Sequence, residues 1–92
     1  MTLQVTHQSD RERYVIEEDG TMVGFVEYEP DAAGLRFTHT EIDPSKHDEG
    51  VGSTLVQEAV DDVRSSGRQV VAECPFVAAW FDKHPDYADA RA

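Results

Sequence analysis

The sequence predicts a single α/β domain in which antiparallel strands are followed by one parallel crossover, giving a mixed sheet. Three observations predict this fold class. Short β-branched and aromatic runs separated by turn residues fill 14–42. An amphipathic helix pattern covers 51–66, and one more short strand pattern follows it at 69–74. Because two strands joined by a helix are normally parallel, the last two strands should be parallel neighbours.

The length of 92 residues limits the chain to one domain, spanning 1–92, with one modest hydrophobic core. No apolar run reaches the roughly 20 residues that a membrane-spanning helix needs. The N-terminus shows neither the basic nor the apolar region of a secretory signal. The single cysteine, Cys74, is typical of a protein from a reducing compartment, so we expect a cytoplasmic protein.

The formal net charge is −11, from 19 acidic and 8 basic residues. Nucleic acids and anionic membranes are excluded as expected partners, because binding them requires clustered Lys and Arg. An acidic, lysine-poor surface suits a high-salt cytoplasm, and an ordinary acidic bacterial protein is the alternative. In either case an anionic ligand would need a local electropositive pocket.

The first part of the chain predicts antiparallel strands. Residues 14–18 form a short strand that runs into Asp19-Gly20, a strong hairpin signal. Residues 22–28 are apolar at nearly every position, which predicts a central strand covered on both faces. A further N-terminal strand over 3–7 is an open option. The expected order is therefore β-β-β-α-β-α, with or without that extra strand.

The third strand is expected at Leu35–Ile42 and ends in polar residues. Simple alternation places four of its side chains on one face, namely Leu35, Phe37, His39 and Glu41. His39 and Glu41 would then lie about 7 Å apart along the strand, a spacing that suits a general base for an incoming amine. The alternative interpretation is a cross-strand polar pair or a solvated edge.

A glycine-rich loop, Gly50-Val51-Gly52-Ser53-Thr54, opens the main helix. Such a loop exposes unpaired N–H groups, and the helix dipole adds partial positive charge, so the spot suits a phosphate. Ser53 and Thr54 would either add hydroxyl donors or merely cap the helix. A P-loop is excluded because Gly52 replaces its lysine, and a dinucleotide fingerprint is excluded because Leu55 replaces its third glycine.

Four separated segments share a resemblance to a known family. His47-Asp48-Glu49-Gly50-Val51-Gly52 resembles the pyrophosphate loop of the GCN5-related N-acetyltransferases, Gln/Arg-x-x-Gly-x-Gly/Ala. With His39-Thr40-Glu41, Cys74-Pro75-Phe76-Val77 and His84-Pro85-Asp86-Tyr87, the chain from about Arg13 to Tyr87 resembles the small YjdJ-type group of that family. The resemblance implies a shortened acyl-CoA N-acyltransferase (GNAT) fold, acetyl-CoA as acyl donor and an amine of unknown identity as acceptor.

The same resemblance implies a cofactor site between the third and fourth strands. It would comprise Ile42, His47, Glu49, Gly50, Val51, Gly52, Ser53, Thr54, Cys74, Phe76 and His84. The sequence departs from the family pattern at His47, where Gln or Arg is usual. The carboxylates of Asp48 and Glu49 would repel a pyrophosphate unless they point outward.

The expected catalytic residues are Cys74, His39 and Glu41. Cys74 would accept the acetyl group in a relay, or it is an inert packed cysteine and the amine attacks directly, assisted by Glu41 or His39. Tyr87 is an option as the acid that protonates the departing thiolate, against a role in core packing. These alternatives stay open at the level of sequence.

Two other functions also stay open. A chain this short lacks the elements that usually wall the acceptor site, so a non-catalytic CoA-binding or interaction module is the main alternative. A metal-binding domain is the other, although no tight ligand spacing is present and no metal site is predicted. Its ligands would come from His39, Glu41, His47, Cys74 and His84. We expect a monomer or a weak homodimer.

Overall fold

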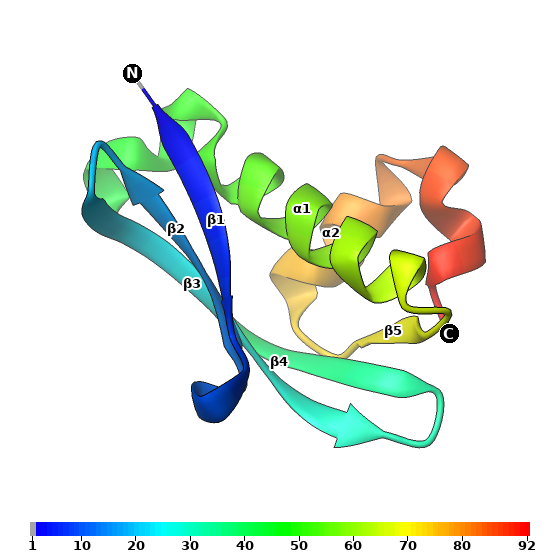
Figure 1. The fold of residues 1–92 in the computed structure, drawn as a ribbon. Coiled ribbons are helices and arrows are strands. Elements are labelled where there is room, and N and C mark those ends of the chain that lie inside the picture. The colour runs from blue at the N-terminus through cyan, green and yellow to red at the C-terminus, as the bar shows by residue number, and fades with distance from the viewer. Residues whose placement is uncertain (1) are drawn as a thin grey trace.

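The computed structural model describes residues 2–92, apart from the side chains of residues 47–49. One five-stranded sheet has the order β1-β2-β3-β4-β5, and two α-helices accompany it (Figure 1). The strands are β1 (Leu3–Gln8), β2 (Arg13–Glu18), β3 (Thr21–Asp31), β4 (Gly34–Ile42) and β5 (Gln69–Ala72). The helices are α1 (Val51–Ser65) and α2 (Pro75–Asp82), with short 3₁₀ turns at Ser9–Arg11, Pro44–Glu49 and Pro85–Ala90.

The predicted order of elements is confirmed, and the optional N-terminal strand is present as β1. Strands β1 to β4 pair antiparallel, and β5 pairs parallel to β4 after the α1 crossover. The hairpin between β2 and β3 turns on Asp19 and Gly20, whose φ angles are 50° and 87°. Positive φ at both central residues is the geometry that favours Asp-Gly in a tight hairpin, so the sequence signal had a direct structural cause.

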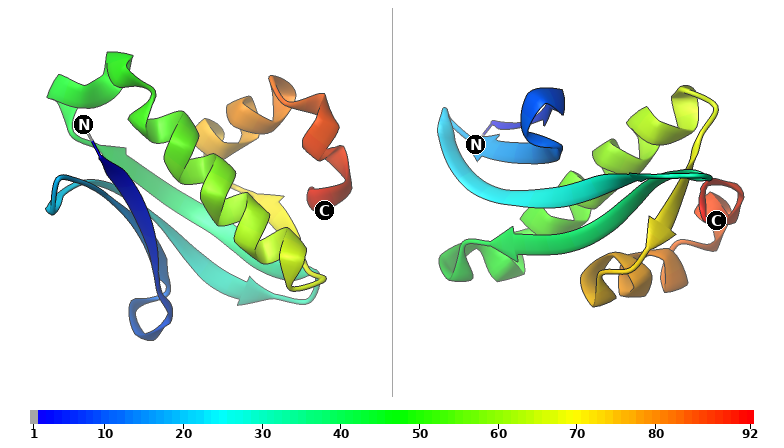
Figure 2. Two further views of the ribbon diagram at one scale, coloured as in Figure 1. Left: turned by 45° about the horizontal axis from the view of Figure 1, so that its top comes forward. Right: turned by 90° about the horizontal axis from the view of Figure 1, so that it is seen from below.

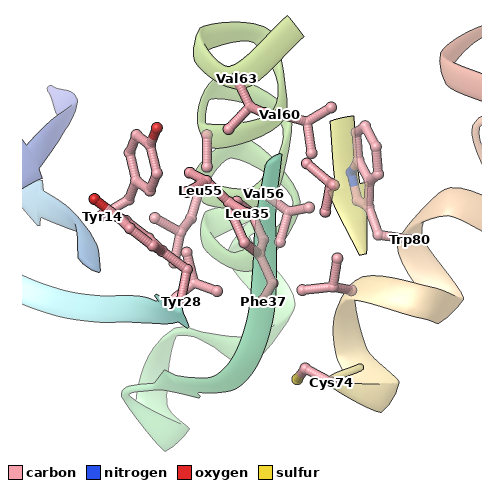
Figure 3. Packing of buried hydrophobic residues seen from close by; sticks show 14 of the residues in the cluster. Tyr14, Tyr28, Leu35, Phe37, Leu55, Val56, Val60, Val63, Cys74 and Trp80 are labelled. Carbon is pink, nitrogen blue, oxygen red and sulfur yellow. The ribbon is translucent and has the colours of Figure 1, made fainter. Parts of the chain in front are cut away.

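The hydrophobic core lies between the sheet and α1, and α2 closes its far end (Figure 3). Helix α1 buries its apolar stripe against the strands, and α2 adds Val77, Trp80 and Phe81. Complete burial of such a side chain is worth about 1.5–3 kcal/mol, so this one layer carries most of the stability of a small domain. The strands contribute Tyr14, Ile16, Val26, Tyr28, Leu35 and Phe37.

Strand β3 is covered fully on one face only, so the prediction that both faces are covered was wrong. Val26 and Tyr28 are buried toward α1, whereas Glu27 is exposed and Phe25 is partly exposed. Both helices lie on the same side of the sheet, as the two views of Figure 2 show. The apolar run led to the wrong prediction because Phe25 and its cross-strand partner Val15 cover one another on the far face, without a helix over them.

A β-bulge in β4 decides which way its polar side chains face. His39 pairs with Glu27, and Phe37 pairs with Tyr28, the next residue of β3, so Thr38 is one extra residue in the ladder. Leu35 and Phe37 therefore face α1, while His39 and Glu41 face the opposite side. The prediction that all four share one face was wrong, because the extra residue breaks the alternation of period two.

The last two strands separate toward the start of α1. Pairing of β4 with β5 runs only from Gly34↔Gln69 to Phe37↔Ala72. One further hydrogen bond, from the Cys74 N–H to the Phe37 carbonyl at 2.9 Å, ends the contact, and Pro75 then begins α2. In the described part of the chain, the segment 38–42 of β4 has no strand on its β5 side.

Candidate functional site

The N-terminus of α1 lies beside the gap that opens between β4 and β5. Gly50 occupies the N-cap position with φ 74°, and the first helical bond runs from the Thr54 N–H to the Gly50 carbonyl at 3.0 Å. Glycine has no side chain to bond the first N–H groups, and no acidic residue lies in the first turn. Within residues 51–54 no carboxylate offsets the positive end of the helix dipole, which suits an anionic ligand.

The two glycines of the loop are required for different reasons. A Cβ on Gly50 would meet no atom within 4 Å, so its left-handed backbone is what favours glycine there. A Cβ on Gly52 would lie 2.5 Å from Cζ of Phe76. Gly52 therefore lets the Phe76 ring lie directly against the first turn of α1, a packing role that the loop pattern alone did not reveal.

A pocket of about 350 Å³ lies between the first turn of α1 and the outer side of α2. Ser53, Phe76 and His84, all predicted as cofactor residues, line it together. Nδ1 of His84 lies 2.7 Å from the Trp80 carbonyl, and its ring stacks on Trp80 at 4.2 Å. Since a carbonyl only accepts, Nδ1 carries the proton, and Nε2 of the neutral ring is an acceptor.

Lys83 also lines this pocket, and the sequence prediction missed it. It ends α2 as the C-cap residue, and it brings a positively charged side chain to the pocket that Ser53 of α1 also lines. The signal was present, because positions 76, 80 and 83 recur at helical spacing and lie on one face of α2. What the sequence did not show is that this face turns toward residue 53.

Cys74 lies at the mouth of the gap between β4 and β5. Its side chain is 6% exposed, and its Sγ lies 3.4 Å from Oγ1 of Thr40. Thr40 belongs to the part of β4 that has no strand on its β5 side, and Cys74 follows β5 as the N-cap residue of α2, so the two side chains face each other across the gap. Thr40 was not predicted, because only the bulge at Thr38 turns it toward Cys74.

His39 and Glu41 lie together on the opposite face of β4. Nε2 of His39 is 3.2 Å from Oε2 of Glu41, and both side chains are more than half exposed. The Phe25 ring lies next to them, with its centroid 6.2 Å from that of His39. The predicted catalytic residues thus form two groups, Cys74 with Thr40 on the helix side and His39 with Glu41 on the other side of the same strand.

The remaining predicted cofactor residues contribute mainly backbone or packing. Val51 is fully buried, so only its main chain can face a ligand, and Ile42 is half-buried against the core. The main chain of His47 and Glu49 belongs to the turn Pro44–Glu49, but their side chains lie outside the described residues. That turn is held by the pair between Nζ of Lys46 and Oε1 of Glu18, 2.7 Å apart.

Tyr87 packs beside the second half of α1. Its ring lies 4.4 Å from the guanidinium carbon of Arg64 and contacts Trp80 edge-on, and only 9% of it is exposed. Its contacts are thus at the end of α1 remote from the glycine loop. They fit the core-packing alternative rather than the role of an acid beside Cys74.

Within residues 2–92, leaving aside the side chains of 47–49, no group of three or more His, Cys, Asp or Glu side chains is arranged to hold a metal ion. No helix in that same part of the chain is long and apolar enough to span a membrane.

The fold is thus that of an α/β protein whose main helix starts, without a side-chain cap, at the end of the sheet where two parallel strands separate. The family model of the GCN5-related N-acetyl-transferases matches residues 13–90. The chain therefore belongs to this family of N-acetyltransferases.

Two solved structures show the same fold. An NMR structure of a GCN5-like protein from Staphylococcus aureus has a TM-score of 0.75 and 20% identity, and the match covers 98% of this chain and 88% of that one. The crystal structure of the ribosomal-protein-S18-alanine N-acetyltransferase from Escherichia coli has a TM-score of 0.66 and 13% identity, covering 89% of this chain and 74% of that one. No curated protein matches this sequence significantly.

Proposed function

We propose that the protein binds acetyl-CoA and transfers the acetyl group to the nitrogen of a primary amine in the cytoplasm. The observation that carries the proposal is the open N-terminus of α1 at Gly50, next to the gap between β4 and β5. In the proposal, main-chain N–H groups of residues 51–54 bind the pyrophosphate, with Lys83 as a nearby cation. The gap takes the pantetheine arm, because the free edge of β4 offers hydrogen-bonding groups to its amides.

The two sides of β4 then have separate tasks. An amine is protonated near neutral pH and must lose a proton before it can attack. The pair of His39 and Glu41 takes this proton, directly or through one water. The nitrogen then bonds to the thioester carbon and the carbon–sulfur bond breaks, and the proton that the attacking nitrogen loses in this step passes to the leaving thiolate. We place direct attack first, because the Cys74 side chain is nearly buried and already in contact with Thr40.

A relay through Cys74 is the competing route, since its sulfur lies at the gap where the thioester would arrive. In a relay, Cys74 would become acetylated and would then release the acetyl group to the amine. Mass spectrometry after incubation with acetyl-CoA, compared with Cys74→Ala, separates the two routes. Acetyl transfer that persists in Cys74→Ala without any protein adduct in the wild type excludes the relay.

Calorimetric titration with acetyl-CoA tests the binding half of the proposal. Ser53→Glu places a carboxylate in the first turn of α1, where it favours the helix dipole but repels a pyrophosphate. We expect its affinity for acetyl-CoA to fall by about tenfold or more, while the folded state is as stable as the wild type. Gln4→Glu on β1 is the matched control, because it adds the same charge on another element.

Three outcomes of that titration can be distinguished. If Ser53→Glu and Gln4→Glu bound acetyl-CoA with equal affinity, the pyrophosphate would bind somewhere other than the first turn of α1. No binding by the wild type would remove the proposal. Binding without turnover over a broad panel of amines would leave a non-catalytic CoA-binding module, the alternative that the exposed His39–Glu41 face leaves open.

A further inference from the structure

A second pocket lies at the other end of the candidate site, on the sheet face away from α1. Its volume is about 230 Å³, and it is formed where β3 begins and β4 ends. This volume equals that of about eight water molecules, enough for a small organic molecule. Its lining includes Met22, Gly24, Phe25, Glu41, Asp43 and Pro44.

This pocket, which we call the acceptor pocket, is continuous with the proposed base. Glu41 belongs both to its lining and to the pair with His39, at 3.2 Å. The Phe25 ring forms part of the pocket and also lies beside the His39 ring. Glu41 also lies in the segment of β4 that leaves β5. A molecule in the pocket therefore lies within reach of the gap that we assign to the acetyl donor.

The lining combines apolar surface with negative charge. Met22 is 48% exposed, an unusual position for a large apolar side chain, and Phe25 and Pro44 extend the same apolar surface. Glu41 and Asp43 supply the charge, and Oδ1 of Asp43 is held at the rim because it accepts from the N–H and the hydroxyl of Ser45.

None of the described residues that line the acceptor pocket is basic. Two cations lie near it in the structure or along the chain, and each contacts another side chain. Arg13 lies over the Phe25 ring at 5.5 Å and donates to Gln8, while Lys46 pairs with Glu18. The pocket therefore attracts an ammonium group and repels a carboxylate or phosphate.

We propose that the acceptor is a small primary amine with an apolar body and without a carboxylate or phosphate beside its nitrogen. Its nitrogen lies at His39 and Glu41, and its apolar body lies against Met22 and Phe25. This inference rests on the proposed function, whose acceptor it specifies. It excludes free α-amino acids and phosphorylated amino sugars, whose anionic groups would face Glu41 and Asp43.

The matched pair of phenethylamine and phenylalanine tests this inference, because the two differ only in the carboxylate beside the nitrogen. Each is titrated into the ¹⁵N-labelled protein saturated with CoA, and amide shifts are followed by NMR. We expect phenethylamine to shift the amides of 22–25 and 41–43 and to bind about tenfold more tightly than phenylalanine. Pentylamine and norleucine form a second pair, in which the apolar body is an alkyl chain and only the carboxylate beside the nitrogen differs.

Two variants act on the acceptor pocket from its two sides. Glu41→Gln removes the attracting charge, and Met22→Lys adds a repelling one at an exposed position that the fold tolerates. Each should weaken phenethylamine binding by about three- to tenfold while leaving the affinity for acetyl-CoA unchanged. Asp86→Asn in the turn Pro85–Ala90 removes the same charge as Glu41→Gln on a different element and should have no effect.

The outcomes separate this inference from the proposed function. If acetyl-CoA does not bind, the proposed function fails, whatever the amines do. If acetyl-CoA binds but phenylalanine binds as tightly as phenethylamine, only the acceptor class is overturned. Shifts confined to residues outside 22–25 and 41–43 would likewise overturn the assignment of the pocket.

Discussion

Gly50 is the residue on which the proposed anion site depends, and Gly67 offers a natural comparison for it. Both adopt a left-handed backbone, with φ 74° and 81°, and a Cβ on either would meet no atom within 4 Å. An alanine at either position thus meets the same backbone strain, about 1–2 kcal/mol in each case. Only Gly50 precedes the N–H groups that we assign to the pyrophosphate.

We therefore predict equal losses of stability but unequal losses of affinity. Urea unfolding should show that Gly50→Ala and Gly67→Ala each lower the unfolding free energy by about 1–2 kcal/mol. Calorimetry should show weaker binding of acetyl-CoA in Gly50→Ala only. If Gly67→Ala weakened binding as much, the effect would reflect general loosening of α1 rather than the loop itself.

Among single residues, the sequence predicts those whose role follows from local spacing along the chain. The helix start at Gly50 was predictable because glycine next to a helical pattern has few structural explanations. Thr40 and Lys83 were missed because each acts across space, one toward Cys74 and the other beside Ser53. Nothing in the sequence near them records those partners.

The bulge in β4 lies directly before the proposed catalytic pair and bends the strand. A bulge leaves its extra residue unpaired and increases the local twist, and here β4 separates from β5 directly after Phe37. Deleting Thr38 would leave every other pair of β3 with β4 in register, so His39 and Glu41 would keep their face. The bend would be lost, and β5 could follow β4 further.

We predict that a Thr38 deletion folds normally but binds acetyl-CoA poorly. The unfolding free energy should change by no more than about 1 kcal/mol, because the ladder becomes regular and no buried side chain is removed. Hydrogen exchange should show new protection of the amides in 38–42. Unchanged affinity for acetyl-CoA in this variant would show that the gap between β4 and β5 does not depend on the bulge.

A polar cluster ties three strands to α1 at the opposite end of the sheet. The Tyr14 hydroxyl donates to Oδ2 of Asp62 at 2.6 Å, and Nε2 of His7 lies 2.6 Å from the Tyr28 hydroxyl. The His7 ring stacks on Tyr14 with 4.2 Å between centroids. Burial, and then the hydrogen bond to Asp62, raise the pKa of Tyr14 well above its ordinary value.

This raised pKa predicts a loss of stability in alkali. The pKa of a tyrosine is about 10 in the unfolded chain. When its pKa is higher in the folded state, its full contribution to the unfolding free energy is present below about pH 10 and falls as the pH rises beyond that value. Unfolding free energies measured from about pH 9 to about pH 11 should fall more steeply for the wild type than for Tyr14→Phe. Parallel curves for the two proteins would show that Tyr14 titrates as freely in the folded state as in the unfolded chain.

Element order was predictable from the sequence, whereas the faces of two strands were not. Period-two alternation, turn residues and one helical stripe predicted four of the five strands and both helices in the correct order, and left the N-terminal strand as an option. The bulge at Thr38 has no glycine or other local mark, so alternation carried His39 and Glu41 onto the wrong face. The prediction that both faces of β3 are covered failed for a related reason. An apolar run does not tell whether a helix covers it or only the side chain of a neighbouring strand.

The whole molecule carries a charge that opposes its proposed ligand. A net charge of −11 repels the phosphates of acetyl-CoA at long range, while the helix start and Lys83 attract them at short range. The Debye length falls from about 10 Å at 0.1 M salt to about 3 Å at 1 M, so salt removes the long-range repulsion first. Composition alone predicted this conflict, but only the fold shows where the local attraction lies.

We predict that acetyl-CoA binds more tightly as KCl rises, opposite to the usual weakening of phosphate binding by salt. The dissociation constant should fall several-fold between about 0.1 M and about 1 M KCl, because screened repulsion over the whole surface outweighs the loss at one helix start. S-acetylpantetheine, which lacks the phosphates, is the control and should respond weakly. A dissociation constant that rises with KCl for acetyl-CoA would mean that Lys83 and the first turn of α1 dominate over the acidic surface, and that the protein does not need high salt to hold its acyl donor.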